Sequence, residues 1–582
     1  MVKKYCVYGD NIIECERMVD ILKSALRPSD IQIFGNPVAP QYRLAVNPTS
    51  EGLDSSLHLS CENQILEISL FPGFGRWAND IGEAIRRGGG VLREAPDIIL
   101  TQVINESETP ILAIEFCSAL PAGNQAWQRS GRAYSTVKAG IPYVFITEIG
   151  GYELDAGRNK KAPRMPNPAV PFSYYSYAKT AHAQISVAYQ MNPGADNRNK
   201  ILYANSIAGK NLHDYIRAII LSQPRQDAYA LLEDHLKDFV RNLSSEPKSG
   251  KLNADDWDLI ACEIEKTGEA SSIISQSNFE WKKRLSIETT KTFSALFSFG
   301  LSTCHGVASC DLPFSIIRRN DIPKFYSTLC NIYGERAQRF STILDIQTNM
   351  VLCWYAGFKP RGDDARPDRG VLPLVRMLLG DKIPALTIIY GPASQEMADN
   401  LEESPEVLVR SNGLWESTIS LSDYVICDSM RISHPVLQLG NMSAIRARQA
   451  QAAIMMPANK NHFPRHEKIK EDDVDSIVRF IFTKLLGGAC HELMCNPPGG
   501  DWSGISLFDD QKEYRWLTLP RVSLESYKRP DHVIQIKDKI LCIESKDYLA
   551  NLENGIGPRL IGFCDELFGS QPSCVKSDKD GS

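Results

Sequence analysis

Two carboxylates and a lysine near the C-terminal end of the sequence could hold a metal ion beside an attacking water molecule. Asp531 opens a run rich in Ile and Val, whereas Glu544 and Lys546 close a second apolar run. Side chains in a β-strand alternate between faces, so Glu544 and Lys546, two residues apart, point the same way. Hard divalent cations such as Mg²⁺ prefer carboxylate oxygens, and a nearby ammonium group can stabilise developing negative charge.

A β-hairpin must position these three residues. Residues 531–536 and 540–546 are predicted strands, and the charged residues 537–539 between them predict a turn. A tight hairpin folds the start of its first strand back toward the end of its second, which brings Asp531 next to Glu544. The competing interpretation is an ordinary charged hairpin whose glutamate and lysine are exposed.

A similar set of residues occurs between positions 95 and 117. Asp97 precedes an apolar strand, Glu115 lies near the end of the next strand, and Cys117 stands where the lysine would be. A helix predicted over residues 124–138 follows. It carries four polar side chains at spacings that share one face, namely Gln125, Gln128, Arg129 and Arg132.

The C-terminal residues resemble the signature of the PD-(D/E)xK nucleases, as found in type II restriction endonucleases. The resemblance rests on the Pro-Asp pair, the gap of 13 positions (544 − 531) and the intact Glu-Ser-Lys sequence. It implies that Asp531 and Glu544 bind Mg²⁺, in a one-metal or a two-metal site, and that Lys546 orients or activates the attacking water. Glu492, expected on the helix before the hairpin, would be a further catalytic carboxylate, with a solvated helical glutamate as the alternative.

The N-terminal hairpin resembles a variant of the same motif, with a gap of 18 positions (115 − 97). The resemblance implies that Asp97 and Glu115 are metal ligands and that Glu83, on a helix predicted over residues 77–87, is the helix carboxylate. The neutral thiol of Cys117 cannot supply the charge of a lysine. Glutamines and arginines of the following helix could approach the phosphate instead. The hairpin is therefore either a second catalytic site or an inactive body that binds DNA or forms a dimer.

Arginines elsewhere could also contact nucleic acid. Residues 359–370 contain Arg361, Arg366 and Arg369 together with three aspartates. Arginine forks match phosphates and guanine edges, so these side chains, with Arg129 and Arg132, are the predicted nucleic-acid-binding residues. The same composition also fits a salt-bridged loop that neutralises itself.

The chain is long enough for several domains. It has 582 residues, 43% of them hydrophobic and 23% charged, which is typical of globular proteins. The expected fold class is α/β (α+β), with restriction-endonuclease-like cores in which helices flank a mixed central β-sheet. The predicted division is an N-terminal α/β segment (1–75), a variant nuclease-like core (76–200), a helical region (201–270), a central mixed domain suited to DNA recognition (271–470), a catalytic core (471–570) and a disordered tail (571–582).

Net charge, motifs and apolar runs exclude several classes of function and partner. The net charge of −6 argues against a protein that coats nucleic acid through bulk charge. The sequence has no P-loop, so no NTP is expected. No apolar run approaches the ~18 residues of a membrane span, so no membrane partner is expected.

The expected function is that of a Mg²⁺-dependent endonuclease, a hydrolase of the restriction-modification or antiviral defence type that cleaves double-stranded DNA in the cytoplasm. Its expected partners are DNA, a second copy of the chain and a cognate DNA methyltransferase. Two alternatives stay open. One is a non-catalytic DNA-binding or scaffold protein with nuclease-like folds, and the other is an RNA-cleaving defence nuclease.

Overall fold

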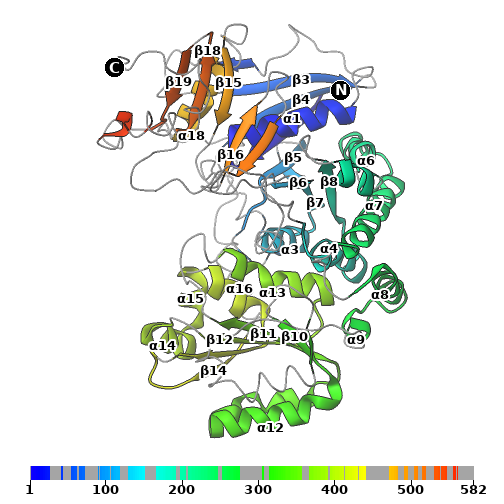
Figure 1. Cartoon of the computed structure of the whole chain (residues 1–582), viewed down its shortest axis with the longest axis vertical. Helices are drawn as coiled ribbons and strands as arrows, with labels where there is room; N and C mark the ends of the chain where they lie inside the picture. Colours follow the sequence, from blue (N-terminus) through cyan, green and yellow to red (C-terminus); the bar gives the residue numbers. More distant parts are fainter. Residues whose placement is uncertain are drawn as a thin grey trace.

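The computed structural model describes the chain in segments. They are residues 2–26, 41–43, 54–61, 64–72, 85, 89–90, 92, 94–104, 107–117, 129–150, 165–191, 197–204, 208–246, 252–274, 304–306, 314–356, 366–390, 393–411, 413–429, 431–440, 471–482, 490–495, 504–508, 514–518, 530–537, 539–546, 555–558 and 560. Mixed sheets flanked by helices form several domains in this part of the chain (Figure 1), so the predicted α/β class is confirmed. The predicted tail, 571–582, lies outside the described residues.

The first sheet contains strands from both predicted segments, 1–75 and 76–200. Its described strands lie in the order β2-β3-β4-β1-β5-β6-β7-β8. β1 is parallel to β4 and antiparallel to β5, whereas β6, β7 and β8 run parallel to one another. The bounds are β1 Val2–Gly9, β2 Gln41–Arg43, β3 Asp54–Cys61, β4 Gln64–Pro72, β5 Ile98–Ile104, β6 Ser107–Cys117, β7 Tyr143–Ile149 and β8 Ile185–Met191.

The predicted boundary at residue 75 therefore falls inside one sheet. β1 lies between β4 and β5, so the segments 1–75 and 76–200 form a single folding unit rather than two. Local sequence patterns predict strands, but they do not report that a strand near residue 5 pairs with one near residue 100.

Helices cover both faces of the first sheet. One face carries α1 (Ile12–Leu26) and α6 (Gly209–Leu221), and the other carries α3 (Ser130–Lys138), α4 (Ala169–Thr180), α7 (Gln226–Ser244) and α8 (Ala254–Thr267). The short helices α5 and α9 span Asn197–Leu202 and Ser271–Ile274. In β6, Leu112 and Ile114 face α1, whereas Ala113 and Cys117 face α3. Glu115 is two residues from both Ala113 and Cys117, so its side chain points to the same face of the sheet, toward α3.

A second sheet lies within residues 304–440. Its described strands lie in the order β14-β13-β12-β11-β10-β9, with β11, β12 and β13 parallel. The bounds are β9 Cys304–Gly306, β10 Phe314–Ile317, β11 Met350–Ala356, β12 Ala385–Tyr390, β13 Tyr424–Asp428 and β14 Val436–Leu439.

Two helical layers enclose this second sheet. One consists of α12 (Ile322–Tyr333) with the 3₁₀ segments η4 (Arg319–Asp321) and η5 (Gly334–Asp345). The other consists of α13 (Arg366–Leu379), α14 (Gln395–Glu403), α15 (Pro405–Ser411) and α16 (Gly413–Leu421).

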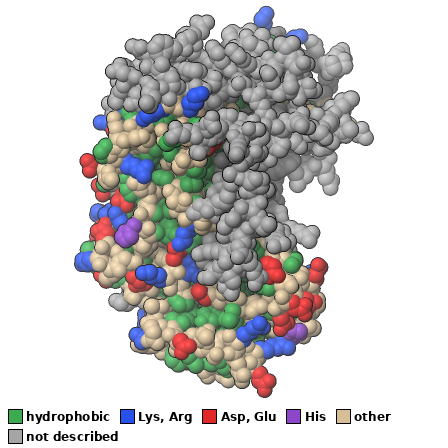
Figure 2. Space-filling view, turned by 180° about the vertical axis from the view of Figure 1, so that it is seen from behind, with side chains coloured by type: hydrophobic (Ala, Val, Ile, Leu, Met, Phe, Trp, Pro, Cys, Tyr) green, Lys and Arg blue, Asp and Glu red, His purple; other side chains and the backbone are tan. Residues whose placement is uncertain are grey.

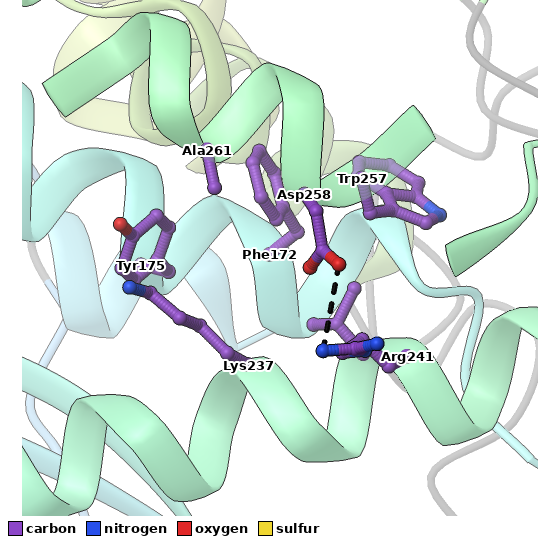
Figure 3. Close-up of a pocket in the computed structure, with 8 residues that line it drawn as sticks. Phe172, Tyr175, Lys237, Arg241, Trp257, Asp258 and Ala261 are labelled. Atoms are coloured by element: carbon purple, nitrogen blue, oxygen red, sulfur yellow. Dashed lines mark ion pairs between the residues drawn. The ribbon is translucent and has the colours of Figure 1, made fainter. Parts of the chain in front are cut away.

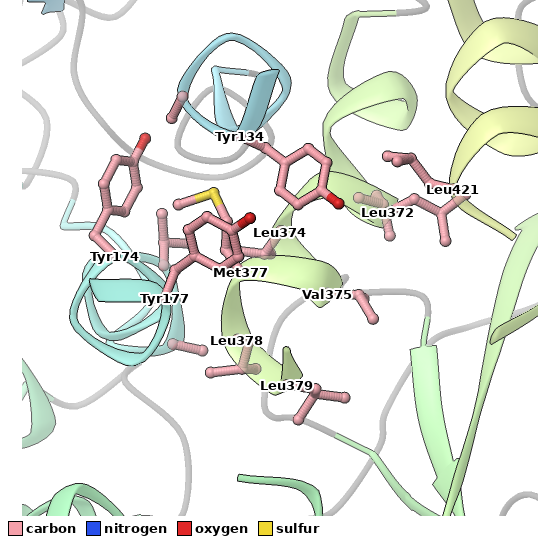
Figure 4. Close-up of a cluster of buried hydrophobic side chains, with 14 of the residues drawn as sticks. Tyr134, Tyr174, Tyr177, Leu372, Leu374, Val375, Met377, Leu378, Leu379 and Leu421 are labelled. Carbon is pink, nitrogen blue, oxygen red and sulfur yellow. The ribbon is translucent and has the colours of Figure 1, made fainter. Parts of the chain in front are cut away.

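The units built on the first two sheets share one apolar core. α13 packs against α3 and α4, and their buried side chains belong to a single cluster (Figure 4). Polar contacts reinforce it, because the Tyr134 hydroxyl donates to Asp381 Oδ1 at 2.7 Å and Lys138 forms an ion pair with the same carboxylate. The two units are therefore packed together.

The third sheet contains the C-terminal hairpin. Its described strands lie in the order β17-β16-β15-β18-β19 and are antiparallel, with bounds β15 Cys490–Cys495, β16 Gly504–Phe508, β17 Tyr514–Thr518, β18 His532–Ile536 and β19 Lys539–Ile543. The pairing of β18 with β19 confirms the predicted hairpin. Lys537, in the turn, has φ 55°, the left-handed conformation that tight hairpin turns require.

α18 (Glu471–Phe480) precedes this sheet and contacts the first unit. Arg479 Nη2 lies 2.7 Å from Glu16 Oε2 of α1. In the described part of the chain, every helix is too short or too polar to cross a membrane. Acidic and basic side chains are interspersed over the described surface of one face (Figure 2), in line with the small net charge.

Candidate active site

The C-terminal hairpin brings its two carboxylates and its lysine to one end. The Ser545 N–H donates to Asp531 Oδ2 at 2.7 Å, and the Asp531 N–H donates to the Ile543 carbonyl at 2.9 Å. These bonds hold the start of β18 against the end of β19. Lys546 Nζ lies 2.9 Å from Glu544 Oε1 and 3.9 Å from Asp531 Oδ2. The three side chains therefore meet, as strand periodicity and hairpin pairing predicted.

Helix α18 adds two carboxylates that the sequence motif does not include. Glu471, at its first position, forms an ion pair with Lys546 Nζ. Asp475, one turn later, is buried, and its Oδ1 lies 3.2 Å from Nε2 of the buried His532. Asp475 Oδ2 is also buried and has no hydrogen-bond partner among the described residues. Positions i and i+4 share one helix face, so α18 presents both acids to the hairpin.

Glu492 does not lie on that helix, so this prediction was wrong. It lies in β15, where it pairs with Ile534 of β18 beside a register shift. Its neighbours include Leu and Met, whose local preference for a helix is overridden by pairing with a distant strand. The sequence signal for the two acids of α18 was the cluster of acidic residues at positions 471–473 and 475, at the start of a helix.

Burial and crowded negative charge shift the acid–base properties of the C-terminal site. Burial first, then Asp475 and Glu544, raise the pKa of Asp531 to about 7, against the opposing effects of the Ser545 N–H and Lys546. Burial by itself would lower the pKa of Lys546, but the bonds with Glu471 and Glu544 raise it above its usual value. The site thus combines a protonated lysine with an excess of carboxylates.

In metal-free buffer with EDTA, wild-type stability should fall as the pH rises from about 4 to about 7. A carboxyl group whose pKa is raised on folding holds its proton more tightly in the folded state, so stabilisation present below the unfolded pKa of about 3.9 is lost as the pH rises through about 7. Stability should depend less steeply on pH in Asp531→Asn than in wild type. The measurement is the urea midpoint of unfolding as a function of pH. Asp20→Asn, at an exposed carboxylate of α1, is the control. Equal slopes in wild type and Asp531→Asn would contradict the expectation.

The N-terminal hairpin has a matching backbone arrangement. The Phe116 N–H donates to Asp97 Oδ2 at 2.8 Å, just as the Ser545 N–H donates to Asp531 Oδ2. In each hairpin the residue that donates this bond is the next residue in the sequence after the glutamate. The Asp97 N–H also donates to Glu115 Oε2 at 3.2 Å, and both of these acids are buried. The likeness predicted between the two hairpins is therefore present in their geometry.

Two arginines engage the carboxylates of the N-terminal hairpin. Arg132 Nη1 lies 2.6 Å from Asp97 Oδ1 and 2.8 Å from Glu115 Oε1. Arg129 Nε lies 2.8 Å from the same Glu115 oxygen. Burial raises the pKa of Glu115 to about 7; Arg132 and Arg129 oppose this shift, and Asp97 adds to it. The neighbouring Cys117 is a buried thiol whose pKa is raised by burial, so it stays neutral.

Arg129 and Arg132, predicted to bind nucleic acid, form ion pairs with two acids of their own unit. Their contact with nucleic acid stays a prediction. The sequence spacing that placed both arginines on one helix face was right, but it did not say that this face points at β6.

The other predicted residues lie apart from both hairpins or outside the described chain. Arg369 Nη1, in α13, lies 3.8 Å from Glu94 Oε1 of the first unit, which is an ion pair within the chain. Arg366 is the first residue of α13. The predicted positions outside the described residues are Glu83, Gln125, Gln128 and Arg361.

A pocket between α4, α7 and α8 contains aromatic and basic side chains (Figure 3). Lys237 Nζ lies 3.0 Å from Glu265 Oε1, and Arg241 Nη1 lies 3.5 Å from Asp258 Oδ2. The rings of Phe172, Tyr175 and Trp257 are at most 3% exposed. The cations are paired and the rings are enclosed, so this pocket is unsuited to stacking bases.

No family model, curated protein or solved structure matches this chain.

Proposed function

We propose that the chain is a metal-dependent endonuclease that hydrolyses phosphodiester bonds in double-stranded DNA at the C-terminal hairpin, as a restriction or defence enzyme. The observation that carries this proposal is the convergence of Asp531, Glu544 and Lys546 at one end of β18 and β19. Glu471 and Asp475 of α18 enlarge the acidic side of the cluster.

The residues present fit a hard divalent cation such as Mg²⁺. Asp531 and Glu544 supply carboxylate oxygens, and Asp475 adds a buried oxygen that has no hydrogen-bond partner in the described part of the chain. Glu471, Asp531 and Glu544 surround the single ammonium group of Lys546 and leave an excess of negative charge, which a divalent cation would balance. When bound, the cation lowers the pKa of a coordinated water and neutralises charge on the phosphate.

Lys546 is suited to stabilising charge rather than to removing a proton. Its bonds with Glu471 and Glu544 raise its pKa, so the ammonium form predominates near neutral pH. In this proposal, its positive charge lies beside the attacking water and the phosphate oxygens, where negative charge develops in the transition state.

The N-terminal hairpin is assigned a non-catalytic role in this proposal. Arg129 and Arg132 neutralise the charge of the Asp97 and Glu115 pair, the position of a catalytic metal in this motif, and Cys117 supplies no charge. One chain then contributes one cutting site, so a double-strand break requires two copies, which favours a homodimer.

Incubation of the purified protein with a mixture of DNA and RNA in Mg²⁺ tests the proposal. Cleavage of double-stranded DNA is expected, and EDTA should stop it because the carboxylates cannot polarise water without the cation. Mapping the cut ends separates single nicks from double-strand breaks. Cleavage of RNA alone would show that the substrate is RNA rather than DNA. DNA binding without cleavage in Mg²⁺ or Mn²⁺ would favour the non-catalytic DNA-binding or scaffold protein.

A further inference from the structure

An additional acidic cluster in the N-terminal unit includes Asp97 but not Glu115. One carboxylate oxygen from each of Asp10, Glu14 and Asp97 lies within 4.8 Å of the other two. Oxygens that share a cation at about 2.0–2.6 Å are separated by at most about 4–5 Å, so this spacing fits one hard cation.

Hydrogen bonds donated by backbone N–H groups hold the three acids in this arrangement. The Asp10 N–H donates to the Asp97 carbonyl at 2.9 Å, which ties the start of α1 to the start of β5. Asn11 Oδ1 accepts from the N–H groups of Ile13 at 3.0 Å and Glu14 at 3.1 Å, which caps α1 and fixes its first turn. The cluster is therefore formed by two segments that are far apart in sequence and rigidly joined.

Glu14 contributes a buried carboxylate oxygen to the cluster. Its Oε2 is buried and has no hydrogen-bond partner among the described residues. Burial first, then Asp97, Asp10 and Glu115, raise the pKa of Glu14 well above its usual value, and Arg17 opposes them only in part. A buried carboxylate oxygen without a donor is destabilising, so this position favours a positively charged ligand.

We propose that Asp10, Glu14 and Asp97 bind a divalent cation such as Ca²⁺ or Mn²⁺, at a site separate from the C-terminal hairpin. Asp97 can still bind a cation, because each of its carboxylate oxygens has two lone pairs. Arg132 donates to one oxygen and the Phe116 N–H to the other, so one lone pair remains on each. The cation clamps α1 to β5 and stabilises the N-terminal unit. The proposal does not depend on nuclease activity.

Mn²⁺ binding to the full chain, followed by electron paramagnetic resonance, tests this site. The Asp531→Asn background removes a ligand of the C-terminal site, so about one bound Mn²⁺ should remain. Adding Glu14→Gln should weaken that binding at least about tenfold, since affinity follows the number of charged ligands. Adding Asp20→Asn instead, an exposed carboxylate on the same helix, should leave it unchanged.

Two results would overturn the site. One is the absence of Mn²⁺ binding to Asp531→Asn at about 1 mM cation, and the other is equal binding by Asp531→Asn with and without Glu14→Gln. Thermal unfolding is the independent readout, because Ca²⁺ should raise the unfolding temperature of Asp531→Asn but not of the same variant with Glu14→Gln added. If Glu14→Gln fails to fold, Asp10→Asn replaces it. If the C-terminal hairpin binds no metal, wild type and Asp531→Asn will bind equal amounts of Mn²⁺. That result is distinct from the two results that would overturn the N-terminal site.

Discussion

Lys546→Ala is expected to reduce DNA cleavage in Mg²⁺ by about 100-fold to 1,000-fold or more. The ammonium group lies 2.9 Å from Glu544 and 3.9 Å from Asp531, so its removal takes away the positive charge next to the reacting phosphate. Plasmid cleavage followed by gel electrophoresis measures the effect. Asp531→Asn should lose cleavage as well, together with one equivalent of bound Mn²⁺.

Lys539→Ala is the matched control for this experiment. Lys539 is exposed at the other end of β19, so its removal changes the net charge equally but leaves the site intact. Because Lys546 also pairs with Glu471, the circular dichroism spectrum and unfolding temperature of Lys546→Ala must be compared with wild type. A folded Lys546→Ala that makes double-strand breaks at the wild-type rate would refute the catalytic role of this lysine.

Arg132→Ala is expected to destabilise the protein by about 3–5 kcal/mol. The arginine bridges Asp97 and Glu115, which are 6% and 0% exposed, and its removal leaves two buried carboxylates close together without that charge. The urea midpoint of the first unfolding transition measures the loss. Arg198→Ala is the control, because Arg198 is 66% exposed and pairs with Glu246 at 3.4 Å, a contact worth about 0–1 kcal/mol.

A double-mutant cycle identifies the cause of that loss. Residues in one ion-pair network have non-additive effects, so Glu115→Gln combined with Arg132→Ala should be less destabilised than the sum of the single variants. Strict additivity, or an Arg132→Ala variant as stable as Arg198→Ala, would show that the arginine does not serve to neutralise Glu115.

The same Glu115→Gln variant reports on the number of cutting sites. If the N-terminal hairpin is non-catalytic, Glu115→Gln should still make double-strand breaks. Conversion into an enzyme that only nicks DNA would mean that both hairpins cut. The contact between α1 and α18, with its pair of Arg479 and Glu16, makes a comparison of folding necessary in this experiment too.

The two hairpins and the meeting of Asp531, Glu544 and Lys546 could be predicted from the sequence. These features are local: apolar strands on either side of a short charged segment pair with each other, and the two-residue period sends Glu544 and Lys546 to one face. The likeness of the Asp97 hairpin followed from the same reasoning.

Tertiary structure alone decided which charges these carboxylates meet. The sequence placed Arg129 and Arg132 on one helix face, but only the packing of α3 over β6 turned that face toward Asp97 and Glu115. Pairing with β18 made Glu492 part of a strand, and α18 supplied Glu471 and Asp475 in its place. Such pairings join segments that are distant in the chain, so their free energies depend on the whole fold, whereas local residue patterns report only on near neighbours.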